Sequence, residues 1–286
     1  MSVTVAVLTS HPSLLPCQLA RLAPQIHLRP DQARVSTIGV GTISEGDVLL
    51  RRYAAAEGPR SLDDASLVDP ADALVYRAEM LQPSASVEES GQPLRFQGWL
   101  FAQSGELEAW PRVQAWVESE LPAQLFPQVS TRTPAEAALM LFLRGMRALA
   151  PAGAEVAPTP AARVLAEVGR ELARRSASEG AAHSARILLV ATDAKMLIAT
   201  RLGANPLYFR LLEGTGECTR CQLGPRTRGR EEVVRAHRQA RAVVVATNPV
   251  PGAHWLALDD GQALAVGKSL QPEVLTPGAN GAATPG

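Results

Sequence analysis

Two cysteines stand close enough along the chain to share chemistry. In "ECTRCQ", Cys218 and Cys221 have the C-x-x-C spacing of half a zinc knuckle or of a redox pair. Completing a zinc site needs two further ligands, and the chain offers Cys17 and five scattered histidines. Three cysteines are also too few to predict a secreted disulfide framework. We therefore expect two free thiols and neither a metal nor a cofactor, unless a dimer shares an ion.

The stretch around this pair is rich in arginine. Residues 220–241 contain seven arginines against two glutamates, a local excess of five positive charges (7 − 2): Arg220, Arg226, Arg228, Arg230, Arg235, Arg238 and Arg241 against Glu231 and Glu232. No aromatic residue is interleaved, so nucleic-acid binding by base stacking is not expected. The run is typical of a solvated, mobile insertion. The alternative is a docking site for an acidic protein surface, with Arg226, Arg228 and Arg230 as its candidate residues.

The whole composition limits the partners of the protein. Lys and Arg total 28 and Asp and Glu total 28, so no net charge recruits nucleic acid or an anionic membrane. The opening "MSVTVAVLTSHPSLL" lacks the basic region and the long apolar run of a signal peptide, and no stretch approaches the length of a transmembrane helix. We expect a cytoplasmic protein with no membrane contact.

Strands are predicted at both ends of the chain. Alternation of Val with small polar residues in "SVTVAVL" predicts a half-buried strand, and two strands over 33–43 and 47–55 form a hairpin turning at Gly46. Two more cover 71–81 and 93–103. In the last third, strands are predicted over 185–192, 195–202, 206–212, 240–247, 254–259 and 263–270.

The centre of the chain is predicted to be helical. Apolar residues recur at helical spacing over 107–121 and 161–175. The helix from Pro134 has a start signal, with Thr133 as N-cap and Glu136 as its capping-box partner. Strands, then helices, then strands predict an α+β protein whose helices pack on antiparallel sheets. Residues 1–277 form one domain, and 278–286, poor in apolar residues, are expected to be a disordered tail.

Three motifs in this order resemble the class II glutamine amidotransferases of the N-terminal-nucleophile (Ntn) hydrolase superfamily. They are "PLRFQGWLFAQSGEL", "TRTPAEAALMLFL" and "LLVATDAKMLIATRLGANPLYFR". The short stand-alone type is the most similar, and the resemblance covers nearly the whole chain. It implies a four-layer αββα sandwich of two mainly antiparallel sheets.

The resemblance also implies a set of site positions, several of them changed. The nucleophile position holds Ser2 in place of an N-terminal cysteine, and the oxyanion position holds Ser104 in place of asparagine, followed by a retained Gly105. Arg77 matches the arginine that binds the substrate carboxylate, whereas the ammonium-binding aspartate falls at Pro134. Each residue also has a structural interpretation: Ser2 as the start of a strand, Gly105 as a turn residue and Arg77 as a surface residue.

These changes predict that amide hydrolysis has been lost while the fold persists. We expect a catalytically inactive amidotransferase-like protein, a pseudoenzyme that acts as a binding or regulatory partner of another protein. The alternative is an amidohydrolase that uses Ser2 and its free amine on a glutamine or γ-glutamyl amide, with Gly105 at the oxyanion and Arg77 on an acidic substrate.

Overall fold

The structure is a computed structural model of the chain, and it describes residues 2–28, 37–64, 69–79, 91–121, 133–150, 154–183, 185–203, 205–252 and 254–276. The predicted tail at 278–286 and most of the loop between the strands near 80 and 94 lie outside these residues. Within them, no helix combines the length and apolar character needed to cross a membrane.

Seven strands form the first sheet, and all of its strand pairs are antiparallel. Their order is β11-β9-β10-β1-β4-β2-β3. The strand bounds are β1 (Val3–Thr9), β2 (Thr37–Ser44), β3 (Asp47–Ala54), β4 (Ala73–Glu79), β9 (Leu207–Leu212), β10 (Ala242–Ala246) and β11 (Leu256–Leu258). The first strand therefore lies in the middle of the sheet, where it pairs with β4 and β10.

Six strands form the second sheet, again with antiparallel pairing throughout. Their order is β13-β12-β8-β7-β6-β5. The bounds are β5 (Leu94–Phe96), β6 (Trp99–Glu106), β7 (Arg186–Thr192), β8 (Leu197–Leu202), β12 (Ala263–Val266) and β13 (Pro272–Leu275).

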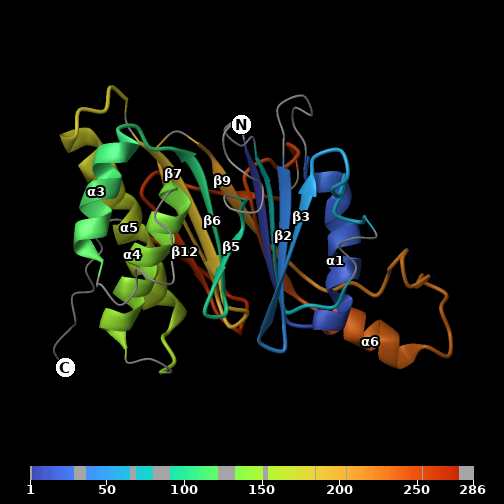
Figure 1. Cartoon of the computed structure of the whole chain (residues 1–286). Helices are drawn as coiled ribbons and strands as arrows, with labels where there is room; N and C mark the ends of the chain where they lie inside the picture. The colour runs from blue at the N-terminus through green and yellow to red at the C-terminus, as the bar shows by residue number, and fades with distance from the viewer. Residues whose placement is uncertain are drawn as a thin grey trace.

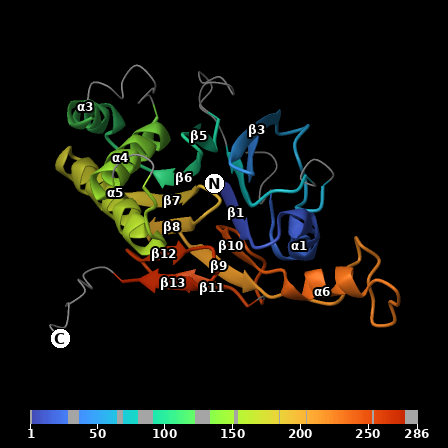
Figure 2. The same cartoon turned by 90° about the horizontal axis from the view of Figure 1, so that it is seen from below.

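Helices cover the outer faces of both sheets, which gives four layers (Figures 1 and 2). Helices α3 (Trp110–Glu120), α4 (Pro134–Leu149) and α5 (Pro158–Ser178) pack on the six-stranded sheet around Phe101, Phe142 and Leu165. Helix α1 (Leu15–Leu22) packs on the seven-stranded sheet through its leucines. Short 3-10 turns, Pro12–Leu14 and Ala23–Gln25, flank α1. Helix α6 (Glu231–Gln239) lies at the α1 side and projects outward.

Period-2 alternation along the strands separates the apolar layers. On β1, Val3, Val5 and Val7 face helix α1, while Ala6 and Leu8 belong to the core between the sheets. The core between the sheets contains only side chains from strands and their connections, so any polar group in it needs a partner inside the protein. This layer positions the site described below.

The predicted α+β sandwich of antiparallel sheets is confirmed, and so are its three central helices. Thr133 accepts a hydrogen bond from the backbone N–H of Glu136, whose carboxylate bonds back to the N–H of Thr133, so the predicted capping box is present. The predicted hairpin turn is also present, with Glu45 and Gly46 at positive φ (53° and 89°).

Two expectations about the elements were wrong. The single strand predicted over 93–103 is a hairpin, β5 and β6, which turns at Gln97 and Gly98 with φ of 48° and 83°. Positive φ at both turn residues matches the twist of a two-residue hairpin. The arginine-rich stretch is not simply a solvated insertion, because its second half forms helix α6. Helix α1 and strand β13 were not predicted.

Candidate functional site

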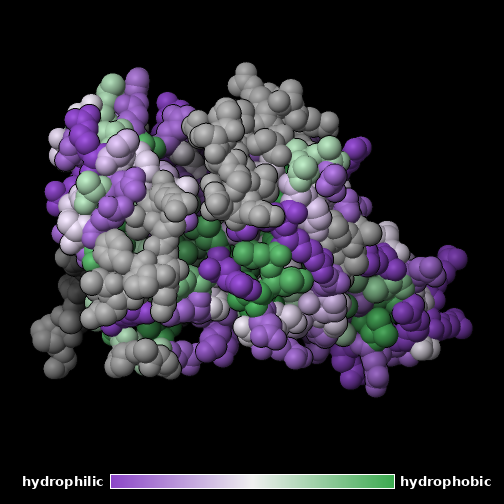
Figure 3. All heavy atoms as spheres, in the orientation of Figure 1, coloured by the Kyte–Doolittle hydropathy of each residue, from purple (hydrophilic) through white to green (hydrophobic). Residues whose placement is uncertain are grey.

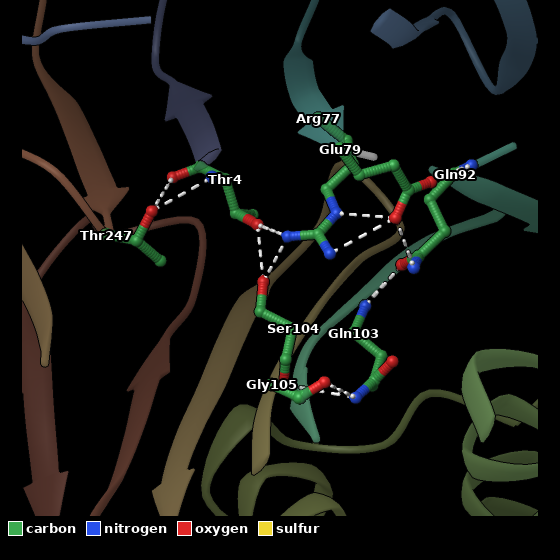
Figure 4. A network of polar contacts seen from close by, with 8 residues as sticks. All are labelled: Thr4, Arg77, Glu79, Gln92, Gln103, Ser104, Gly105 and Thr247. Atoms are coloured by element: carbon green, nitrogen blue, oxygen red, sulfur yellow. Dashed lines mark hydrogen bonds and ion pairs between the residues drawn. The ribbon is translucent and has the colours of Figure 1, made fainter. Parts of the chain in front are cut away.

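A buried polar cluster lies at one end of the layer between the two sheets (Figure 4). Most of its residues occupy inward-facing positions near the ends of three strands, β1, β4 and β6. Val75 of β4 faces the core between the sheets, so Arg77 and Glu79 follow on the same face; Ala102 of β6 is likewise followed by Ser104. The inward-facing positions are therefore apolar along most of β4 and β6 and polar near the ends of these strands.

Arg77 occupies the centre of the cluster. Its side chain is 4% exposed, and its Nη1 donates to Thr4 Oγ1 at 2.8 Å and to Ser104 Oγ. Nε and Nη2 donate to Glu79 Oε2 at 3.3 and 3.2 Å. Burial lowers the pKa of Arg77, and the Glu79 carboxylate opposes that shift. The guanidinium stays charged, because its pKa starts far above neutrality.

Glu79 is the charge partner of this arginine, and it is itself held by Gln92, which lies just before β5. Its Oε1 accepts from the backbone N–H of Gln92 at 3.1 Å, and its Oε2 accepts from Gln92 Nε2 at 3.1 Å. Gln92 Oε1 accepts in turn from the backbone N–H of Gln103 at 2.6 Å. The ion pair therefore belongs to a hydrogen-bonded chain that ties β4 to β6.

The two sequence-predicted oxyanion residues have different surroundings. Ser104 Oγ lies 2.9 Å from Thr4 Oγ1 and also accepts from Arg77, so its hydroxyl is fully engaged. Gly105 has φ of 99°, and a Cβ there would lie 1.8 Å from the carbonyl oxygen of Arg186 on β7. Backbone conformation and close approach alone require glycine at this position. It lies inside β6 rather than in a turn after the strand.

Ser2 lies immediately before β1 and is partly exposed. Thr4, two residues further on, is bonded to both Arg77 and Ser104. The structure therefore brings Arg77 and Ser104 together and places Ser2 at the same end of the sheet. Within the described residues, Ser2 makes no hydrogen bond to the cluster.

Four residues of this cluster were not identified from the sequence: Thr4, Glu79, Gln92 and Gln103. One signal was present, since Arg77 and Glu79 are two residues apart on a predicted strand and must share a face. The interpretation of Arg77 as an ordinary surface residue was wrong, because the side chain is almost fully buried.

The three candidate partner-binding arginines lie in the segment between β9 and β10, residues 213–241, which we call the β9–β10 excursion. Arg226, Arg228 and Arg230 are all exposed. Arg230 also donates from Nη1 to the carbonyl oxygen of Cys221 at 2.8 Å. In Figure 3, the region of α6 shows a hydrophobic patch (green) bordered by hydrophilic side chains (purple).

The structure also places one set of possible metal ligands together. Cys17, Cys218, Cys221 and His237 have ligand atoms that all lie within 4.8 Å of one another. They lie on the outer, α1 side of the seven-stranded sheet, away from the buried cluster around Arg77. None of the three cysteines forms a disulfide in the structure. The sequence did not show that Cys17 and His237 lie beside the C-x-x-C pair.

Comparison with known proteins identifies the fold. No protein-family model and no curated protein matches the chain. Among solved structures, a glutamine aminotransferase class-II domain protein from Silicibacter pomeroyi is similar with a TM-score of 0.57 and 16% identity, over 96% of this chain and 98% of that one. A predicted glutamine amidotransferase from Pseudomonas aeruginosa gives a TM-score of 0.54 and 15% identity, over 96% and 99%.

A larger enzyme contains the same fold as one of its parts. Glutamine phosphoribosylpyrophosphate amidotransferase from B. subtilis matches with a TM-score of 0.50 and 11% identity, over 96% of this chain and 48% of that chain. The chain therefore has the Ntn-type sandwich fold of class II glutamine amidotransferase domains, as the sequence motifs implied.

Proposed function

We propose that this chain is a cytoplasmic binding or regulatory protein built on a class II glutamine amidotransferase scaffold that no longer hydrolyses amides. The observation that carries the proposal is the state of Arg77. Its guanidinium makes four hydrogen bonds, all to groups of the chain itself: two to Glu79, one to Thr4 and one to Ser104.

A carboxylate-binding arginine needs free N–H groups that face a cavity, because a strong pair with a carboxylate is usually bidentate. Four of the five N–H groups of Arg77 are already bonded within the chain, and the side chain is buried and paired with Glu79. A substrate carboxylate would have to displace Glu79 and leave that acid buried without its cation. Removing one partner of a buried ion pair costs about 3–5 kcal/mol, which opposes such an exchange.

The oxyanion position supports the same conclusion. Ser104 has a shorter side chain than asparagine, and its hydroxyl is bonded to Thr4 and Arg77. Loss of one oxyanion donor typically lowers the rate about 100- to 1000-fold. The backbone conformation and the close approach of β7 are enough to require glycine at position 105. The presence of Gly105 therefore does not support a catalytic role.

The test is an assay of ammonia release from glutamine and from γ-glutamyl amides, with protein purified from its native host and its N-terminus defined by mass spectrometry. We expect no turnover above the buffer rate. Turnover that disappears in the Ser2→Ala variant would overturn the proposal.

The alternative, an amidohydrolase that uses Ser2, is favoured by one observation. Ser2 lies two residues from Thr4, which contacts both Ser104 and Arg77. This chemistry needs Ser2 to carry a free α-amine as its base. A native N-terminus that begins before Ser2 would therefore exclude it.

For the binding role, we propose that the exposed arginines of the β9–β10 excursion contact an acidic protein surface. Arg226 and Arg228 have exposed side chains and lie in a turn between the cysteine pair and α6. The double variant Arg226→Glu/Arg228→Glu should lose the partners that co-purify with the wild-type protein from the host. High salt should release the same partners from the wild-type protein, because salt screens exposed charges. Unchanged co-purification would remove this surface from the proposal. Arg163→Glu, at an exposed position on α5, is the control.

A further inference from the structure

We propose that Cys17, Cys218, Cys221 and His237 bind one zinc ion, which fastens the β9–β10 excursion to helix α1. The expectation from the sequence was two free thiols, because nothing in the sequence places Cys17 or a histidine beside them. The fold supplies both missing ligands from the same chain, so no dimer is needed.

The spacing of the four ligand atoms fits a single ion. All of them lie within 4.8 Å of one another, and Cys17 Sγ lies 3.4 Å from Cys221 Sγ. In a tetrahedral site with zinc–sulfur bonds of about 2.3 Å, neighbouring ligand atoms are about 3.8 Å apart. The set therefore needs only small side-chain movements to enclose an ion.

The cysteine pair has the local backbone of a metal-binding turn. Cys218 and Leu223 exchange two backbone hydrogen bonds of 3.0 and 2.8 Å, and Gln222 N–H donates to the carbonyl of Thr219. Gln222 has φ of 53°, which closes the turn directly after the second cysteine. The result is a tight loop that points both thiols to the same side, toward α1 and its Cys17.

His237 has the hydrogen bonding of a metal ligand. Its Nδ1 lies 2.9 Å from the carbonyl oxygen of Val233, which can only accept, so Nδ1 carries the proton. The neutral ring then has its lone pair on Nε2, and this atom is buried without a hydrogen-bond partner among the described residues. Histidine ligands of metals usually donate their other N–H to a carbonyl or carboxylate, as here.

The excursion also lacks an apolar core that would hold it. Of its 29 positions, 213–241, the buried ones are Leu223, His237 and Ala240. Helix α6 fully buries only His237, and its apolar residues Val233, Val234 and Ala236 are partly exposed. Small segments with so little apolar burial are commonly stabilised by a disulfide or a metal.

Positively charged side chains lie near the ligands. A divalent ion with three thiolates and a neutral imidazole carries a net negative charge. Arg230 bonds the carbonyl of Cys221, and Arg21 lines the same cavity of about 370 Å³ as Cys17 and Cys218. Burial and the neighbouring thiols raise the pKa of Cys17. A bound cation and nearby arginines act in the opposite direction, because positive charge stabilises thiolates.

Zinc is the metal that this donor set favours. Three sulfurs and one imidazole in tetrahedral array are typical of structural zinc sites, and all four ligands come from the protein. The competing use of the same atoms is a disulfide between Cys17 and Cys221, which their 3.4 Å separation would allow after a small movement.

The experiment measures metal content and thiol state together. Full-length protein is purified under reducing conditions without chelators, and its zinc content is measured by inductively coupled plasma mass spectrometry. We expect about one zinc per chain, and about one equivalent of Co²⁺ bound by the metal-free protein with a sulfur-to-cobalt charge-transfer band. His237→Gln and Cys17→Ser should each lose most of the bound zinc.

Two controls separate the site from general effects. His254→Gln removes an exposed histidine outside the cluster and should retain full zinc content. If Cys17→Ser or His237→Gln folds poorly, the test uses the wild-type protein. Its three thiols should be protected from a thiol reagent while the metal is bound and should react after the metal is removed by a chelator. Reduced wild-type protein that binds neither Zn²⁺ nor Co²⁺, or a Cys17–Cys221 disulfide in the native protein, would overturn the proposal.

Limited digestion with trypsin tests the fastening role. Arg235 and Arg238 lie in α6, and the ion would hold this helix through His237. We expect cleavage after these arginines to accelerate on chelation and to slow again when zinc is restored. Equal cleavage in both states would show that the ion does not fasten the excursion.

Discussion

At the scale of single residues, the buried Arg77–Glu79 pair lies on β4, and Arg77 also bonds to Thr4 on β1 and Ser104 on β6. A buried ion pair contributes little net stability compared with apolar residues, but it is costly to break. Both side chains are nearly inaccessible, at 4% and 11%. The pair is therefore sensitive to the loss of either member and tolerant of the loss of both.

We predict that Arg77→Met lowers the free energy of unfolding by about 3–5 kcal/mol, because the buried Glu79 carboxylate loses the positive charge of Arg77. The double variant Arg77→Met/Glu79→Met should recover most of this loss, as measured by urea denaturation. In the exposed pair of Arg170 and Glu167, Arg170→Met should change stability by less than about 1 kcal/mol. A double variant as unstable as the single one would contradict a structural ion pair.

Gly105 gives a second residue-scale prediction. Gly105→Ala combines a strained positive φ with a Cβ 1.8 Å from a backbone oxygen, so we expect a loss of about 2–5 kcal/mol. Gly98 also has positive φ, but its Cβ would meet no atom within 4 Å. Gly98→Ala should therefore cost only about 1 kcal/mol. Equal losses in thermal or urea unfolding would refute the close-contact explanation.

At the scale of elements, α4 owes its sharp start to Thr133 and Glu136. Thr133→Ala removes the acceptor of the Glu136 N–H, and we expect a loss of about 0.5–2 kcal/mol in urea denaturation. Glu136→Gln keeps an acceptor for the Thr133 N–H and should cost less. A larger loss of stability in Glu136→Gln than in Thr133→Ala would show that the charge of Glu136 stabilises the helix more than the Thr133 cap does.

The elements also show what the sequence could and could not predict. Strands with clear alternation and helices with apolar stripes were identified, because their burial pattern follows from local periodicity. Helix α1 was missed because it is short and begins between two prolines, Pro12 and Pro16. Helix α6 was missed because it is short and mostly exposed, with His237 as its one buried residue.

Sites made by long-range contacts were harder to predict than elements. Cys17 and Cys221 are 204 residues apart and meet only because the β9–β10 excursion folds back on α1. Thr4 and Ser104 are 100 residues apart and meet across the two sheets. The resemblance to class II amidotransferases identified the positions of Arg77 and Ser104 but not Glu79, which changes what Arg77 can bind.

At the scale of the whole molecule, the two polar clusters lie on different layers. The Arg77 cluster closes one end of the layer between the sheets, while the four cysteine and histidine ligands lie outside the seven-stranded sheet beside α1 (Figures 1 and 4). Loss of the metal should therefore loosen the arginine-rich excursion and leave the sandwich intact. The proposed binding surface lies on the α1 side, away from the buried cluster around Arg77.

The central claim is that Arg77 is occupied by the chain's own groups and is closed to a substrate carboxylate. Thermal unfolding of the purified protein with increasing L-glutamine tests it most directly, because a ligand that binds the folded state at 100 times its dissociation constant stabilises it by about 2.7 kcal/mol. We predict no change in the unfolding midpoint at any concentration. A saturable rise that is absent from Arg77→Lys would contradict the claim.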